Sequence, residues 1–179
     1  MFKNVLLAAS FIQIIISTAF AQATFNTVKT GHVVSFSVPE YMSRTTGIND
    51  ASFLQFKSIP KDVYTFMIED SKEELSIAEM KFTSVMDFYE YFIKDFLISE
   101  KKRKVSAPVS STKDGVNYVQ SELTYFDKEA DSDIYYNITM AETEGYFYQI
   151  LSFTSEENSI NVKADLTALG SSLKEVNCP

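Results

Sequence analysis

The segment GYFYQILSFTSEEN, from Gly145 to Asn158, constrains the fold most, because its first half is apolar at nearly every position. Successive side chains of a strand point to opposite faces, so both faces of this predicted strand are hydrophobic. One face carries Tyr146, Tyr148 and Ile150, and the other carries Phe147, Leu151 and Phe153. An aromatic wall of a ligand site is one interpretation. A central strand covered by helices on both sides explains the same pattern without a ligand.

Two segments show the periodicity of helices. The first is predicted over Ser84–Ile98, where Ser84 followed by Asp87 resembles a capping box. Its apolar positions are Val85, Phe88, Tyr89, Phe92 and Phe96. The second begins after Ser155, which is a suitable N-cap. Its apolar stripe consists of Val162, Leu166, Leu169, Leu173 and Val176.

The remaining segments are predicted to be strands. Besides the opening stretch, these are HVVSFSVP (32–39), ASFLQFKS (51–58), DVYTFMIED (62–70), KVSAPVSSTK (104–113), GVNYVQSELTYF (115–126) and DIYYNITMAETE (133–144). Pro108 suits an edge strand, and the KDG sequence ending at Gly115 supplies a hairpin turn. Strands, a long helix, a meander of strands and a final helix predict an α+β fold with an antiparallel β-sheet sandwiched between helices.

The N-terminus is typical of a cleaved secretory signal peptide. A short basic start is followed by a mostly apolar run and by Ala19-Phe20-Ala21 at the predicted cleavage site. A transmembrane anchor is the alternative, but the run is short for a bilayer and Gln13 interrupts it. We therefore expect a signal peptide over residues 1–21, one domain over residues 22–179, no later membrane span, and a secreted or periplasmic location.

Charge and cysteine content narrow the classes of function. The formal net charge of −8 argues against nucleic acid as a partner, because phosphate binding depends on lysine and arginine. Cys178 is the only cysteine, so no intramolecular disulfide can form. His32 is the only histidine, and no nucleophile motif accompanies it. We expect neither enzymatic activity nor a cofactor.

One acidic segment resembles part of a calcium loop. Its alternating carboxylates are Asp127, Glu129, Asp131 and Asp133. Ser132 stands where such a loop needs glycine, and Ile138 stands where it needs glutamate. A solvated hairpin loop is the alternative, and the failed match favours it.

The sharpest charge feature is the run Lys101, Lys102, Arg103 and Lys104. It could contact an acidic partner or anionic lipid headgroups. The alternative is a helix C-terminus that carries favourable charge, followed by a solvated loop. Tyr91 lies off the main stripe of the first predicted helix and is a further candidate for an interaction surface.

The chain resembles the PsbP-like family in three segments. GHVVSFSVPEYM (31–42) is similar to that family's first strand, which ends in proline. GYFYQILSF (145–153) and the downstream ALGSSLKEV (168–176) are similar to its last strand and the end of its closing helix. The resemblance covers nearly all of the mature chain and implies an α/β/α sandwich of the kind found in bacterial envelope proteins, usually with a non-enzymatic role. It identifies no metal or partner site, and a fold of this kind hosts several functions.

These observations together predict a secreted or periplasmic binding domain that docks on an envelope or extracellular protein or complex. The alternative is a carrier or sensor of a small apolar ligand or a divalent cation. A pocket of several hundred Å³ between sheet and helix would favour the carrier. A surface patch without a pocket would favour docking.

Overall fold

The structure, a computed structural model, describes residues 23–29 and 34–176. The predicted signal peptide, His32 and Cys178 lie outside the described residues. Within the described part, no helix is both long and apolar enough to cross a membrane.

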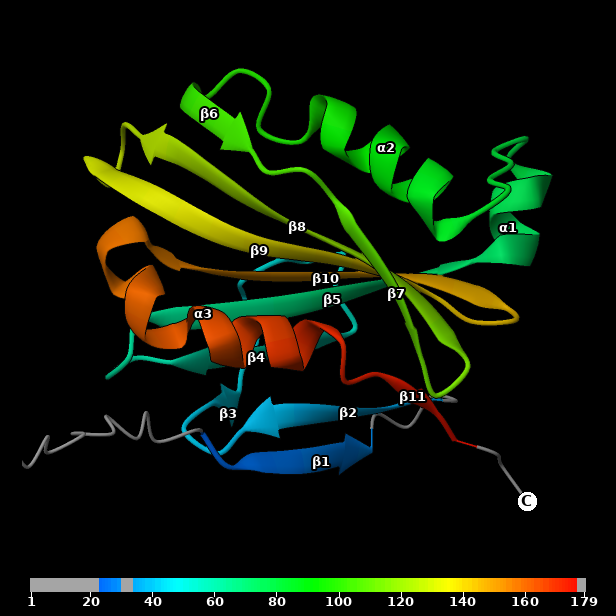
Figure 1. The fold of residues 1–179 in the computed structure, drawn as a ribbon, viewed down its shortest axis with the longest axis horizontal. Helices are drawn as coiled ribbons and strands as arrows, with labels where there is room; N and C mark the ends of the chain where they lie inside the picture. The colour runs from blue at the N-terminus through cyan, green and yellow to red at the C-terminus, as the bar shows by residue number, and fades with distance from the viewer. Residues whose placement is uncertain (1–22, 30–33, 177–179) are drawn as a thin grey trace, which may run out of the picture.

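The main element is an eight-stranded antiparallel sheet (Figure 1). Seven strands follow the order β3-β4-β5-β10-β9-β8-β6, and β7 pairs with β8 beside β6. Their bounds are β3 Ser43–Arg44, β4 Leu54–Ser58, β5 Val63–Ser71, β6 Lys101–Val105, β7 Val109–Lys113, β8 Val116–Asp127, β9 Ser132–Glu142 and β10 Tyr146–Ser155. The predicted α+β sandwich is confirmed.

A different layer covers each face of this sheet. Helices α1 (Lys72–Ile77) and α2 (Val85–Asp95) lie over one face. The other face is covered by α3 (Glu156–Gly170) together with a small antiparallel sheet. The small sheet has the order β1-β2-β11, with β1 Phe25–Lys29, β2 Val34–Pro39 and β11 Lys174–Glu175. The sequence did not reveal that this layer combines a helix with a second sheet.

The central strand β10 is buried on both faces, as its sequence predicts. Phe147 and Leu151 belong to the hydrophobic cluster under α2, and the Phe147 ring stacks on Phe88 at 4.7 Å between centroids. Tyr148 and Ile150 belong to the cluster under α3 and β2. These four side chains are at most 2% exposed. They form a packed interior, which explains the aromatic content without a ligand wall.

Helix α2 begins as predicted but ends earlier. The Ser84 hydroxyl accepts a hydrogen bond from the Asp87 N–H at 3.2 Å, so Ser84 is the N-cap. The Asp87 carboxylate accepts instead from the backbone and hydroxyl of Thr83, which lowers the pKa of Asp87. The helix ends at Asp95, not at Ile98, because Leu97 adopts a left-handed backbone with φ of 55°.

Helix α3 starts after Ser155, whose hydroxyl accepts from the Asn158 N–H at 3.4 Å. The predicted stripe through Val176 is too long, because the helix ends at Gly170. Leu173 lies beyond the helix but is still buried. Its carbonyl accepts a hydrogen bond from the Tyr118 hydroxyl at 2.6 Å, and the next residues form β11, which pairs with β2. The segment that follows α3 therefore joins the small sheet.

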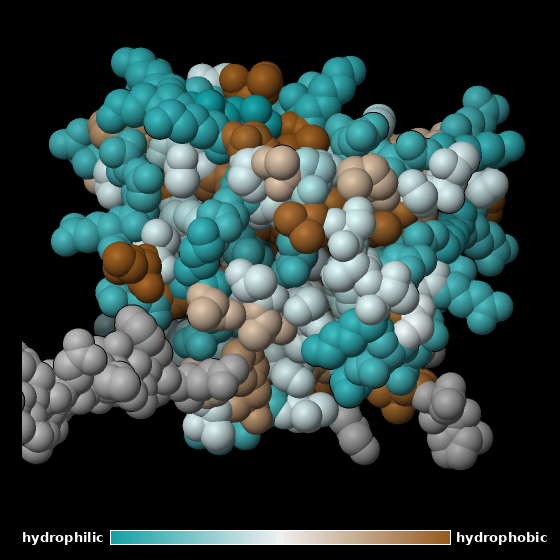
Figure 2. Space-filling model, viewed as in Figure 1, coloured by the Kyte–Doolittle hydropathy of each residue, from teal (hydrophilic) through white to brown (hydrophobic). Residues whose placement is uncertain are grey.

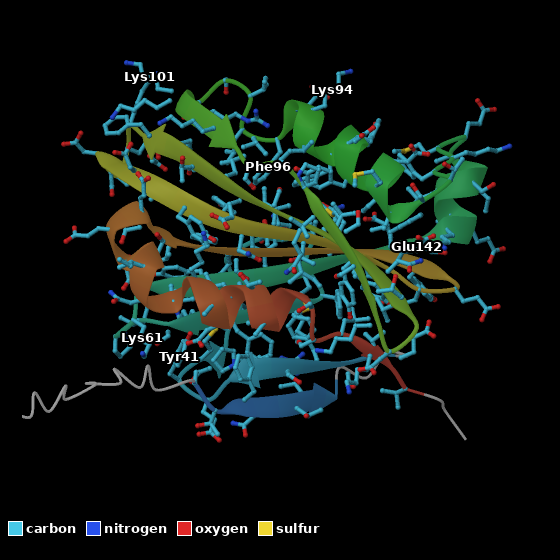
Figure 3. The ribbon with its side chains drawn as sticks, viewed as in Figure 1. Tyr41, Lys61, Lys94, Phe96, Lys101 and Glu142 are labelled. Atoms are coloured by element: carbon cyan, nitrogen blue, oxygen red, sulfur yellow. The ribbon has the colours of Figure 1, made fainter. Side chains whose placement is uncertain are left out.

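A polar contact joins the segment that follows β2 to helix α3. The Tyr41 hydroxyl donates to Asp165 Oδ2 at 2.9 Å, and Lys61 Nζ lies 4.6 Å from the Tyr41 ring centroid (Figure 3). Burial, and then the hydrogen bond to Asp165, raise the pKa of Tyr41 well above its usual value. The tyrosine therefore stays a hydrogen-bond donor at neutral pH.

Candidate functional site

The basic run forms strand β6 at an edge of the main sheet. The alternative of a helix C-terminus followed by a solvated loop is therefore wrong for this run. Lys104 pairs with Thr124 and Lys101 with Phe126, with an irregularity between them where Lys102 has φ of 56°. The edge then leaves the sheet around Pro108 and returns as β7. The single edge strand predicted over 104–113 is therefore two strands.

Arg103 serves the fold and is not free to meet a partner. Its Nε donates to the Phe96 carbonyl at 2.9 Å, and its Nη2 donates to the Ile93 carbonyl at 2.6 Å. Both carbonyls lie at the C-terminal end of α2, where carbonyl groups lack helical partners. Arg103 therefore caps α2 from the neighbouring edge strand.

We expect Arg103→Ala to lower the free energy of unfolding by about 1 to 3 kcal/mol, because two carbonyls lose a charged donor. Lys104→Ala is the matched control, since Lys104 is exposed and forms no ion pair among the described residues. Its expected cost is below about 0.5 kcal/mol. Chemical denaturation of the two variants measures the difference, and equal costs would contradict the capping role.

The three lysines of the run differ in their contacts. Lys102 Nζ lies 4.6 Å from the Phe126 ring centroid and 3.5 Å from Asp133 Oδ1. Lys101 and Lys104 are exposed, and in the described part of the chain neither has a carboxylate partner. These two lysines are therefore the available charges of β6.

Tyr91 lies on the outer surface of α2. Its side chain is 59% exposed, and its ring meets Phe82 edge-on at 5.3 Å between centroids. Lys94, also exposed, follows on the next turn, and Figure 3 shows Lys94 and Lys101 on the same side of the molecule. Among the described residues, no hydrogen bond, ion pair or ring contact joins Tyr91 to the run 101–104.

Within the described residues, strand β7 pairs with β8 on one side and with no strand on the other. The two-residue turn of Asp114 and Gly115, with φ of 52° and 82°, closes the hairpin between Lys113 and Val116 as predicted. Hydrogen bonding to β8 alternates outward from this pair. The N–H and C=O groups of Ser110 and Thr112 consequently point away from the sheet. All five residues of β7 are exposed.

The surface over this edge carries little charge. Residues 106–112 read SAPVSST, between the lysine run of β6 and Lys113. Figure 2 views the same side of the molecule, and pale and brown atoms gather near its centre between teal areas. Val109, 66% exposed, is among the large apolar side chains that remain exposed.

Two hollows flank β7. The first, called the α2 hollow, has a volume of about 360 Å³ and lies between β7 and the start of α2. Ser84, Val85, Ser110, Thr112 and Glu142 are among its lining residues. The second, called the α3 hollow, has a volume of about 200 Å³ and is lined by residues that include Ala107, Val109, Ser121 and Thr167.

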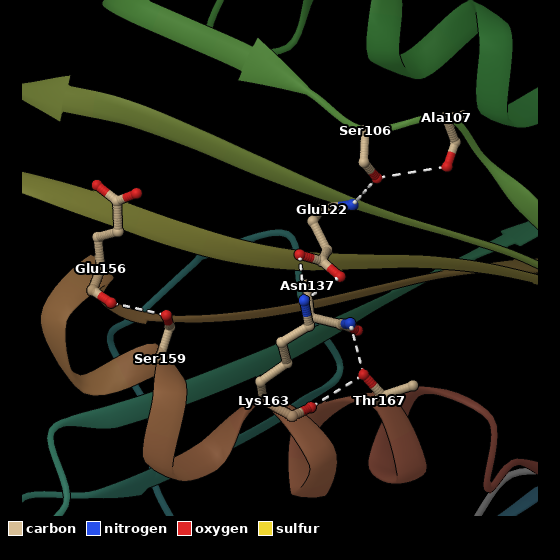
Figure 4. A network of polar contacts seen from close by, with 8 residues as sticks. All are labelled: Ser106, Ala107, Glu122, Asn137, Glu156, Ser159, Lys163 and Thr167. Carbon is tan, nitrogen blue, oxygen red and sulfur yellow. Dashed lines mark hydrogen bonds and ion pairs between the residues drawn. The ribbon is translucent and has the colours of Figure 1, made fainter.

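A polar network fixes the walls of the α3 hollow (Figure 4). Lys163 Nζ pairs with Glu122 Oε1 at 2.7 Å, and Asn137 Nδ2 donates to Thr167 Oγ1 at 3.3 Å. The Ser106 hydroxyl accepts from the Glu122 N–H at 2.9 Å, which holds the break in the edge against β8. These contacts join β8, β9 and α3 around the hollow.

The Ser121 side chain does not face the α3 hollow. Ser121 pairs with Ile138, which packs under α2, whereas its neighbours Gln120 and Glu122 point toward α3. Its hydroxyl is buried on the α2 side of the sheet and has no hydrogen-bond partner among the described residues.

The carboxylate of Glu142 fixes the walls of the α2 hollow. Glu142 Oε1 accepts from Lys72 Nζ at 2.8 Å, and Glu142 Oε2 accepts from the Val85 N–H at 3.1 Å. One carboxylate thus links α1, β9 and the start of α2, and Figure 3 labels it between these elements. Both oxygens are engaged, so this carboxylate serves the fold.

The four carboxylates of the calcium candidate do not form a common ligand set. Asp127 Oδ1 accepts from the Glu129 and Ala130 N–H groups at 2.8 and 3.0 Å, which lowers the pKa of Asp127 and shapes the turn. Asp133 pairs with Lys102. In residues 23–29 and 34–176, no group of three or more His, Cys, Asp or Glu residues is placed to hold a metal ion. Asp131 and Asp133 instead line a depression with Glu156 and Glu157.

A further hollow lies between α1 and the segment before α2. Its volume is about 260 Å³, and its lining includes Lys72, Leu75, Lys81, Phe82 and Phe147. Lys72 Nζ lies 4.8 Å from the Phe147 ring centroid. Lys72 is paired with Glu142, so Lys81 is the lining cation that has no ion pair among the described residues. Apolar side chains and this lysine suit a small anionic amphiphile.

No family model and no curated protein matches this sequence. Among solved structures, cyanobacterial PsbP (CyanoP) from Synechocystis sp. PCC 6803 superimposes with a TM-score of 0.62 at 14% identity, covering 88% of this chain and 95% of that one. The fold is PsbP-like. LpqN of Mycobacterium tuberculosis, described as involved in cell envelope biogenesis, has a TM-score of 0.59 at 10% identity, with 86% and 91% covered.

A third PsbP-like neighbour is a protein of unknown function from Pseudomonas aeruginosa, described as a putative regulator. It has a TM-score of 0.50 at 10% identity, covering 87% of this chain and 98% of that one. At these identities the likeness shows the fold, so a function must be argued from the site itself.

The sequence predicted an edge strand over 104–113, but neither the outward backbone groups of Ser110 and Thr112 nor the two hollows beside β7. Pro108 and the uncharged stretch that follows it were the available signals for an edge. Hollows depend on side chains from several elements, and no sequence pattern predicts them.

Proposed function

We propose that this chain is an extracytoplasmic, non-catalytic binding domain that docks on an envelope protein or complex through its β6–β7 edge. The observation that carries the proposal is the exposed backbone edge of β7 next to the unpaired lysines Lys101 and Lys104. An exposed strand edge is a template for pairing with another chain, and proteins usually cover or block it.

Two further observations support this proposal. The predicted signal peptide of residues 1–21 favours a location outside the cytoplasm. LpqN, which shares the fold, is described as involved in cell envelope biogenesis.

A photo-crosslinking amino acid placed at Val109 tests the proposal in the envelope of the producing cell. We expect a discrete adduct from Val109 and none from the same probe at Ile160, which is 85% exposed on α3. Lys104→Glu should lower the yield about tenfold, because it places a like charge against the partner. Lys128→Glu, the matched charge reversal in the exposed β8–β9 turn, should leave it unchanged. Equal adducts at both probe positions would contradict docking through this edge.

The second candidate function is binding of a small amphiphilic anion, such as a fatty acid, in the hollow between α1 and the segment before α2. The pairing of Lys72 with the Phe147 ring and the apolar lining favour it. Displacement of a fluorescent fatty acid from the mature protein tests this function. Lys81→Glu should abolish binding of that probe, and an unchanged signal would contradict a site in this hollow.

A further inference from the structure

We propose that the docking partner supplies an extended, acidic peptide segment that adds to the main sheet as a strand alongside β7. The proposal rests on the docking function above and specifies how the edge is recognised. Strand addition uses backbone hydrogen bonds for affinity and pockets for alternate side chains for specificity. The edge of this protein offers both.

The backbone of β7 determines the geometry of the added strand. Val109, Ser111 and Lys113 turn their backbone groups to β8, so Ser110 and Thr112 turn theirs outward. Their N–H and C=O groups are spaced for one neighbouring strand. Pro108 and Lys113 stand at the two ends of this stretch, and the bulge at Lys102 protects β6. Between these ends, residues 109–112 contain no proline, charged side chain or bulge that would block pairing with another strand.

The hollows on the two faces of β7 accept alternate side chains of the added strand. Side chains of a strand point alternately to the two faces, so one set would enter the α2 hollow and the next the α3 hollow. The α3 hollow is small, and its lining includes Ala107, Val109 and Thr167. It suits a small side chain, such as alanine or threonine. The larger α2 hollow, lined by Ser110 and Thr112, suits a longer neutral polar side chain.

The charges around the edge select an acidic segment over a second copy of this chain. A strand that continues past Val109 runs toward β6, where Lys101 and Lys104 have no carboxylate partner within residues 23–29 and 34–176. Two copies of β7 paired antiparallel would instead bring Lys113 of one copy toward the β6 lysines of the other. Like charges placed opposite each other oppose such pairing.

Selection from a phage-displayed library of random linear peptides on the mature protein tests the proposal. We expect enriched sequences that are acidic and alternate small with polar residues. A synthetic peptide with an enriched sequence should bind the Ser110→Pro protein about tenfold more weakly than the parent protein, because this substitution removes one outward N–H and adds a ring at the edge. Ile160→Ala, which changes an exposed side chain of α3 away from this edge, is the control and should bind like the parent protein.

A second readout does not depend on the folding of a variant. The selected peptide should lose binding to the parent protein when it is N-methylated at the alternate residues whose N–H groups face β7. N-methylation of the other residues should leave binding unchanged. Equal loss with both peptides, or enrichment that persists on Ser110→Pro, would overturn strand addition. If no peptide sequence is enriched on the parent protein relative to the Ser110→Pro protein, strand addition is also overturned.

These outcomes separate the inference from the proposed function. If the Val109 crosslink forms equally in Ser110→Pro cells, docking at the edge stands and strand addition fails. If neither the crosslink nor peptide binding occurs, both fail. Sedimentation that shows a dimer of the parent protein and a monomer of Ser110→Pro would assign the edge to a second copy and overturn the acidic partner.

Discussion

Replacement of Ile150 or of Leu151 by alanine is expected to lower the free energy of unfolding by about 2 to 5 kcal/mol in each case. These neighbours on β10 point to opposite faces, and each is 1% exposed. Ile150 lies in the cluster under α3 and β2, and Leu151 lies in the cluster under α2. Each truncation leaves a cavity in a different layer, so the two costs should be similar and additive within about 0.5 kcal/mol.

Ile160→Ala is the control for this pair, because Ile160 is 85% exposed on α3 and its truncation should cost less than about 0.5 kcal/mol. Urea denaturation of the single and double variants gives the free energies. A small cost for either Ile150→Ala or Leu151→Ala would mean that one face of the central strand is open. That result would contradict the sandwich and reopen the interpretation of these residues as a ligand wall.

Gly170→Ala is expected to destabilise the protein by about 2 to 3 kcal/mol, although alanine normally stabilises a helix relative to glycine. Gly170 is the last residue of α3 and lies against β9 and β8. A Cβ atom there would fall on the Thr139 hydroxyl and within 2.9 Å of Gln120 Nε2. The side chains of Thr139 and Gln120 are hydrogen-bonded to each other at 2.9 Å, so neither can move without loss.

A double-mutant cycle with Thr139→Ala checks this cause. Thr139→Ala alone should cost about 1 to 2 kcal/mol through its lost hydrogen bonds. Because it also removes the hydroxyl that meets the new Cβ, the double variant should be at least about 1 kcal/mol more stable than the sum of the single costs predicts. Strict additivity in thermal or chemical unfolding would show that the close approach of α3 to β9 is wrong.

The sequence predicted the main layers because hydrophobic periodicity reports burial directly. The double-faced pattern of residues 146–153 identified the central strand, and the caps Ser84 and Ser155 located the starts of α2 and α3. Helix ends were less predictable. Leu97 and Leu173 continue the apolar spacing beyond the observed ends of α2 and α3. Leu97 adopts a left-handed backbone and so cannot extend α2. The segment after α3 pairs with β2 as strand β11.

Some elements had no local signal. Helix α1 buries none of its residues, so no apolar stripe marks it. Strand β6 is a run of cations that resembles a charged loop, and pairing with β8 makes it a strand. The small sheet β1-β2-β11 joins segments from the two ends of the described chain, and such long-range pairing is not visible in either segment alone.

The sequence carried a partial signal for the candidate site. It singled out the run Lys101 to Lys104 as a candidate contact surface, which stays a prediction, but the same run contains Arg103, whose side chain caps α2. The backbone groups of Ser110 and Thr112 depend on hairpin register, which the Asp114-Gly115 turn sets. Sequence patterns report side-chain burial well, and unpaired backbone groups poorly.

Amide hydrogen exchange of β7, measured residue by residue by NMR, tests most directly that this edge is free to accept a strand. In the isolated mature protein, the N–H groups of Ser111 and Lys113 should be protected by β8, while those of Ser110 and Thr112 should exchange rapidly. Addition of a selected peptide should slow Ser110 and Thr112 and leave Ser111 and Lys113 unchanged. Protection of Ser110 and Thr112 before any peptide is added, or rapid exchange after saturation, would contradict the account.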